Sequence, residues 1–170
     1  MNPRRRFSLA ALAALAAATA APWLPVRAAA PVVEVHGSSD AYGEPGVALA
    51  WAVRRGADER STQVVLRIVV DPARFPRLAV VGRDPFGGAE HVLLAPAVTA
   101  GRVELAIPRA HFADFPRTEI RLHAPGTGAP PRVVYYLGVP DTTPEFASEP
   151  ALDAYLADRI ARVRRPEGNR

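Results

Sequence analysis

The sequence predicts an antiparallel β-sandwich of immunoglobulin-like proportions, followed by an amphipathic C-terminal helix. From Val32 onward, short runs rich in Val, Leu and Ile recur every 12–18 residues, and Gly, Pro and Asp separate them. A helical pattern follows only after the last run. Many short strands without intervening helices are typical of sandwiches and barrels. We therefore expect residues 29–138 to form the β-domain and residues 139–170 an extended arm and helix.

The alternation of apolar and polar residues locates the individual strands. Val103, Leu105 and Ile107 fall on one face of a strand, for example, and polar residues lie between them. The same reasoning places strands near 32–36, 47–54, 63–70, 78–83, 90–95, 102–107, 118–124 and 132–138.

Three of these strands are apolar on both faces, which requires a cover on both faces. They are the runs at 47–53, 64–70 and 133–137. In the first, the alternate positions are Ala48, Ala50 and Ala52, and such small side chains suit close approach by another element.

The C-terminal helix is the expected cover. Ser148-Glu149-Pro150 is typical of a helix start, because Ser caps and Pro is tolerated in the first turn. Two arrangements remain open. Either the helix packs on its own sheet, or the arm and helix dock onto a partner protein. In the second case the predicted partner contacts are Phe146, Leu152, Tyr155, Leu156 and Ile160.

The N-terminal segment has the three parts of a cleavable export signal. Arg4, Arg5 and Arg6 provide the positive charge, and an apolar run follows from Phe7. Small residues at Val26 and Ala28 predict cleavage after Ala28, whereas cleavage after Ala30 would leave a proline first. Two prolines, Pro22 and Pro25, end the apolar run before the about 20 residues that a membrane span needs. We therefore expect no stable membrane anchor.

The sequence Arg4-Arg5-Arg6-Phe7 resembles the twin-arginine (Tat) signal, with its paired arginines, any residue and then Phe. An ordinary general secretory (Sec) signal is the alternative. The resemblance implies a periplasmic or secreted protein that is carried across the membrane in the folded state.

Removing the signal changes the charge balance of the chain. All 21 basic residues are Arg, and four of them (Arg4, Arg5, Arg6 and Arg27) precede the cleavage site. The remaining 142 residues carry 17 Arg against 17 Asp and Glu, so we expect no nucleic-acid partner. The absence of Cys excludes disulfides, thiolate catalysis and iron–sulfur clusters, and the absence of Lys excludes Schiff-base chemistry. No cofactor is predicted.

One set of side chains offers metal or acid–base chemistry at the ends of the strands. A divalent metal needs about three converging His or carboxylate ligands. The candidates are His91, His111, Asp114 and His123, and their spacing does not show convergence.

The leading interpretation is an exported, non-catalytic accessory protein that contacts another exported protein, a class that includes subunits of periplasmic redox complexes. The alternative is a metal- or small-ligand-binding protein or enzyme that uses the histidine and carboxylate candidates. The loop at 82–88 offers Phe86 as an exposed aromatic residue, with Arg83 and Asp84 beside it.

Overall fold

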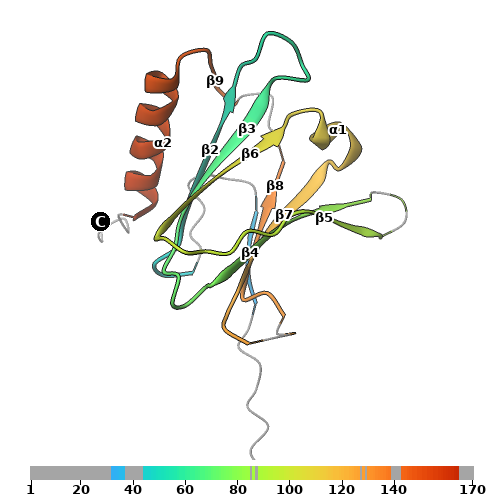
Figure 1. Cartoon of the computed structure of the whole chain (residues 1–170), viewed down its shortest axis with the longest axis vertical. Helices are drawn as coiled ribbons and strands as arrows, with labels where there is room; N and C mark the ends of the chain where they lie inside the picture. The colour runs from blue at the N-terminus through green and yellow to red at the C-terminus, as the bar shows by residue number, and fades with distance from the viewer. Residues whose placement is uncertain are drawn as a thin grey trace, which may run out of the picture.

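The computed structural model describes two β-sheets and a C-terminal helix that lies beside one of them (Figure 1). The described residues are 32–36, 44–84, 86, 88–126, 128, 130–138 and 143–164. The predicted export signal (Arg4, Arg5 and Phe7) and the predicted cleavage site at Ala28 lie outside this part of the chain.

Each of the eight predicted strands is present, with ends shifted by no more than one residue. Two short elements were not predicted as such: a single helical turn lies in the segment before the seventh strand, and part of the extended arm joins a sheet. In chain order the elements are β1 (Val33–His36), β2 (Ala48–Arg54), β3 (Gln63–Val69), β4 (Arg77–Arg83), β5 (Glu90–Leu94), β6 (Arg102–Pro108), α1 (His111–Asp114), β7 (Arg117–His123), β8 (Val133–Leu137), β9 (Glu145–Phe146) and α2 (Glu149–Arg164).

The strands form a five-stranded sheet in the order β1-β8-β7-β4-β5 and a four-stranded sheet in the order β6-β3-β2-β9. Most neighbours are antiparallel, as predicted, but β1 pairs with β8 and β9 pairs with β2 in parallel. Each parallel pair joins segments that are far apart in the chain. A short turn forces the two strands that it joins to run antiparallel. The strands of these two pairs are joined by long stretches of chain, so either direction is possible for them.

Both sheets contribute to one hydrophobic core. The inward residues of β2, β3 and β6, such as Trp51 and Leu66, pack with those of β4, β7 and β8, such as Leu78, Ile120 and Leu122. Their spacing of two along each strand is the alternation read from the sequence. The two sheets are therefore held together by apolar burial between them.

A second, smaller apolar cluster lies on the opposite face of β2 and β3, under α2. Ala48, Ala50 and Ala52 face the helix, and the helix contributes Leu152 and Leu156. Helix α2 is thus the closely packed element that the small side chains of the alanine row predicted. Among the described residues, neither helix combines the length and apolar character needed to cross a bilayer.

The structure therefore has the first of the two arrangements, in which α2 covers its own sheet. Leu152, Leu156 and Ile160 are buried in this contact. Phe146 and Tyr155 pack at its margin, with ring centroids 5.1 Å apart. All five residues predicted as partner contacts are thus engaged within the chain.

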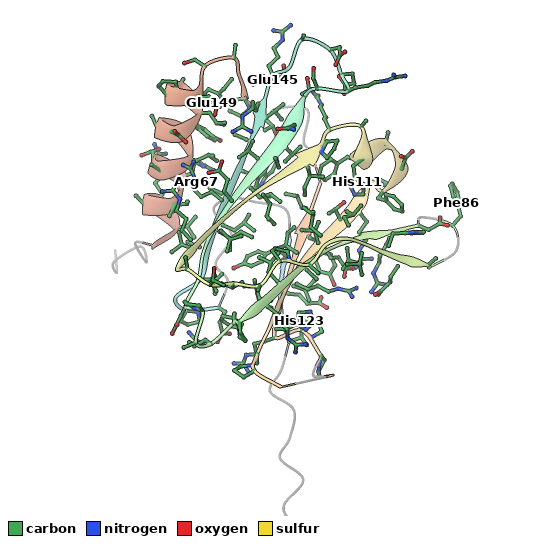
Figure 2. All side chains as sticks on the ribbon, in the orientation of Figure 1. Arg67, Phe86, His111, His123, Glu145 and Glu149 are labelled. Carbon is green, nitrogen blue, oxygen red and sulfur yellow. The ribbon has the colours of Figure 1, made fainter. Side chains whose placement is uncertain are left out.

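A buried arginine fixes the position of α2 on the sheet. Arg67 of β3 is only 3% exposed, and its Nη2 donates to Glu104 of β6 at 2.7 Å and to Asp153 of α2 at 2.6 Å. Figure 2 shows Arg67 between the sheet and the helix. Because a buried charge is costly unless paired, the two carboxylates restrict where the helix can lie. Hydrogen bonds from Arg67 lower the pKa of Asp153.

We expect Leu156→Ala to destabilise the protein by about 2–5 kcal/mol, because a fully buried leucine leaves a cavity between α2 and the sheet. Arg162→Ala, on the exposed side of the same helix, is the control and should cost about 0.5 kcal/mol or less. Chemical denaturation measures both. Equal stability of the two variants would show that α2 is not docked on the sheet.

Candidate functional site

The candidate site is the outer side of β5, the last strand of the five-stranded sheet. We call this unpaired side the β5 edge. Within the described chain, β5 pairs only with β4, so a row of peptide groups faces outward along its other side. Figure 1 shows the β4–β5 hairpin on the side of the molecule away from α2. The edge is therefore open to another chain.

Exposed apolar side chains gather at this edge. Phe86 is 97% exposed at the tip of the hairpin (Figure 2), Val92 is 64% exposed, and Leu94 is 38% exposed. Among the described residues, only one other large hydrophobic side chain, Val32, is comparably exposed. Single exposed apolar residues need no explanation, but three on one hairpin mark a candidate contact surface.

The two edge strands of the other sheet carry no exposed large apolar side chain among the described residues, unlike β5. Strand β6 presents Arg102 and Glu104 on its outer face and ends in Pro108, and both charges and proline discourage pairing. Strand β9 is only two residues long and lies next to α2. Strand β5 contains no proline; it is short, has a register shift opposite Val80 and Val81 and carries Glu90, but it still exposes Val92 and Leu94.

The outer face of the sheet beside the β5 edge carries a network of ion pairs, which we call the Arg–Glu network. Glu119 of β7 is buried and accepts hydrogen bonds from Arg121 at 2.7 and 2.9 Å. Arg121 also donates to both carboxylate oxygens of Glu90, at 2.7 and 2.8 Å. Arg83 of β4 lies 3.0 Å from Glu90 and 2.7 Å from Glu119, the latter an ion pair that is not aligned for a hydrogen bond.

The Arg–Glu network ties β5 to β4 and β7. Hydrogen bonds from Arg121 lower the pKa of Glu90, so the carboxylate is ionised at neutral pH. Arg117 lies over the ring of Tyr136, whose hydroxyl donates to Glu34. With Glu34 included, three arginines face three glutamates, so the formal charges on this face balance.

The inner face of the same hairpin carries four rings, His91, His111, Phe112 and Phe115, which we call the ring cluster. The centroid of Phe115 is 4.9 Å from that of His91 and 4.8 Å from that of His111, with the second pair stacked. Phe115 fits because the facing residue is Gly82, where an added Cβ would lie 2.7 Å from the Phe115 Cγ. The inner face of the sheet beside β5 is therefore lined by aromatic rings.

The surroundings of His111 shift its pKa and fix one of its hydrogen bonds. Its Nε2 lies 3.2 Å from the Oγ1 of Thr118, whose hydroxyl donates to the carbonyl of Phe115. Thr118 must then accept from His111, which places the proton on Nε2. Burial lowers the pKa of His111, and the nearby Asp114 acts in the opposite direction.

The predicted metal candidates are only partly brought together. His91 and His111 both pack on Phe115, and Asp114 is exposed in α1. His123 lies at the other end of β7, and Figure 2 shows it far from His111. In the part of the chain that the structure describes, no group of three His, Asp or Glu residues could hold a metal ion. The observed contacts of the two grouped histidines are ring packing and a hydrogen bond.

A groove of about 580 Å³ lies between α2 and strands β3 and β6. Arg67 and Arg102 provide its polar groups, and Val69 and Ile160 are among its apolar walls. Arg67 is already paired with two carboxylates, so the exposed Arg102 is the polar group of the lining that has no ion pair among the described residues. It is a weaker candidate than the β5 edge.

We expect Gly82→Ala to destabilise the fold by about 1–3 kcal/mol, because the new Cβ displaces Phe115 from the ring cluster. Gly101→Ala is the matched control: the nearest atom to its Cβ would be 3.7 Å away. Such a change should be neutral or stabilise by up to about 1 kcal/mol. Thermal unfolding compares the two, and a stable Gly82→Ala variant would contradict the ring packing.

We expect His111→Gln to flatten the pH dependence of stability between pH 7.5 and 5. Because the folded-state pKa of His111 lies below the unfolded value, its contribution is complete above the unfolded pKa and is lost as pH falls below it. The glutamine amide still donates to Thr118 but does not titrate. The melting temperature of each protein across this range measures the effect, and equal slopes would contradict a lowered pKa of His111 in the folded protein.

Comparisons with known proteins place no constraint on this site. Neither the family models nor the curated proteins nor the solved structures that were searched contain a match to the chain. Function is therefore inferred from the edge, the Arg–Glu network and the ring cluster themselves.

Proposed function

We propose that the chain is an exported, non-catalytic accessory protein that binds another exported protein through the β5 edge. In this proposal the two sheets are a β-sandwich of immunoglobulin-like proportions, and α2 completes one side of it. The other sheet then presents the binding surface. Rigid sheets that display a contact surface at one edge are suited to binding, because little order must be gained on association.

The single observation that carries the proposal is the open apolar edge. Val92, Leu94 and Phe86 are exposed on one hairpin, and the peptide groups of β5 have no partner strand on that side among the described residues. Native proteins ordinarily protect such an edge with charge, proline or a covering element. A partner protein that covers the edge accounts for the exposed apolar side chains of this hairpin.

Export rests on the N-terminal sequence. Arg4, Arg5 and Phe7 match the twin-arginine pattern, and cleavage after Ala28 releases the described domain. A twin-arginine route carries folded cargo, so a small domain can travel with, or be made for, a larger folded companion. The proposed partner is therefore periplasmic or secreted, and a subunit of a redox complex belongs to this class.

The proposed contact differs from the one that the helical pattern suggested. Phe146, Leu152, Tyr155, Leu156 and Ile160 pack within the chain, and exposing them would require α2 to leave its sheet. The β5 edge needs no such rearrangement. We therefore place the partner on the five-stranded sheet and assign α2 a structural role.

Photo-cross-linking in the cell of origin tests the proposal. A photoreactive amino acid replaces Val92 in the full chain, and in a matched control it replaces Val32, the exposed valine at the opposite edge of the same sheet. We expect one discrete heterologous adduct in the extracytoplasmic fraction from position 92 and none from position 32. Adding Phe86→Ala should reduce the adduct severalfold if the hairpin tip contributes contact area.

The opposite outcomes are equally definite. An exported protein that forms no adduct from position 92, or the same adducts from both positions, would rule out the β5 edge as the binding surface. An adduct with twice the mass of the chain would identify a second copy as the occupant.

A further inference from the structure

We infer that the groove between α2 and strands β3 and β6 binds a small carboxylate with an apolar body, such as a medium-chain alkanoate. The inference goes beyond the proposed function, because this groove lies beside α2 and not at the β5 edge. It rests on the size of the groove, on its apolar walls and on two arginines with unused N–H donors.

The groove is large enough for a small molecule. Its volume of about 580 Å³ falls within the range of about 300–1,000 Å³ that is typical of ligand sites. Small residues keep it open, since Gly101 precedes β6, and Ala157 and Ala161 lie about one turn apart on α2. Val69 and Ile160 provide larger apolar walls. The lining therefore suits the apolar body of a ligand.

Arg67 is the first arginine of the lining, and one of its donors is unused. A guanidinium has five N–H groups. Nε and Nη2 use three of them on Glu104 and Asp153, at 2.6–3.1 Å. Of the two on Nη1, one makes a long hydrogen bond of 3.5 Å to the carbonyl of Asp153, and the other has no acceptor among the described residues. Because Arg67 is buried, an unused N–H costs free energy that a bound acceptor would recover.

Arg102 is the second arginine of the lining, and its side chain has no ion pair within the described chain. In the strand register Arg67 lies opposite Glu104 and Arg102 lies opposite Val69, so the two arginines are diagonal neighbours on one face of the sheet. The Cβ atoms of such neighbours are roughly 7 Å apart, which long side chains span. Donors of both guanidinium groups can therefore converge on one carboxylate, the acceptor whose geometry they match.

The formal charges of the groups around Arg67 balance, so the argument for a carboxylate concerns donors and not a surplus of charge. These groups are Arg54, Arg67 and Arg102 against Glu104, Glu149 and Asp153. Hydrogen bonds from Arg67 lower the pKa of Asp153, and the charge of Arg102 adds to this effect. Arg102 still lacks a hydrogen-bonded acceptor in the described chain. A cationic head group fits less well, because both polar groups of the lining are guanidinium groups.

Four probes test the inference on the purified protein. Octanoate combines the anionic head with the apolar body, octanamide has the same body with a neutral acceptor, octylammonium has a cationic head, and acetate has the anionic head alone. Backbone amide signals are followed by NMR during titration with each probe. We expect octanoate to shift the signals of Gly101, Arg102 and Ala161 in a saturable manner, and the other three probes to bind at least severalfold more weakly.

Two pairs of variants locate the binding site. Arg102→Gln should weaken octanoate binding about tenfold or more, because a charge-assisted hydrogen bond is lost. Arg60→Gln, at an exposed arginine in the turn before β3, is the control. Ala161→Phe fills the groove from an exposed position and should abolish binding, whereas Ala151→Phe, in the first turn of the same helix, should not. Circular dichroism confirms that all four variants remain folded.

The contrary results are specific. Equal binding of octanamide or octylammonium removes the requirement for a carboxylate, and equal binding of acetate removes the apolar body. Unchanged octanoate binding by Arg102→Gln or Ala161→Phe places the ligand elsewhere, and no saturable shift at millimolar octanoate shows that the groove does not take this class of ligand. Each of these results overturns the inference and leaves the proposed function as it stands, because none of the probes tests the β5 edge.

Discussion

The burial of β2 and β3 on both faces is the constraint on which the rest of the fold depends. Their inner residues, such as Leu66, join the core between the sheets, and their outer residues, such as Ala50 and Val65, are equally buried. A strand of this kind is stable only if both faces are covered. The chain meets the requirement by returning its last segment, through β9, so that α2 lies on the outer face.

Helix α2 covers the outer face of the four-stranded sheet, whereas the described part of the chain places no helix on the outer face of the five-stranded sheet. That outer face carries the ion pairs of the Arg–Glu network, so it needs no second layer, whereas the last strand of the sheet still exposes Val92 and Leu94. The ion pairs between Arg121 and Glu90 tie β5 to the interior of the sheet. They hold a short edge strand in an ordered, extended form, which reduces the entropy cost of binding a partner.

Sequence alone predicted the strands, the second layer over β2 and the start of α2, because each depends on local periodicity or helix capping. It did not predict which strand would lie at an edge. The edge positions of β5 and of the parallel strand β1 follow from pairings between residues far apart in the chain, namely β4 with β7 and β1 with β8. The packing of His91 and His111 on Phe115 was missed for the same reason, because it depends on Gly82 facing that ring. The exposed Phe86 was the one local signal of the site.

An open edge is also a hazard, and this links the site to the export signal. Unprotected β5 edges invite pairing with any extended chain, so an unaccompanied domain is prone to aggregate. The hazard is smallest if the domain folds in the company of the partner that covers the edge. Arg4, Arg5 and Phe7 resemble the signal for a route that exports folded proteins. Such a route would allow that pairing before translocation. In the proposed function, the predicted signal and the exposed β5 edge are therefore explained by the same companion, bound from the time the sheet forms.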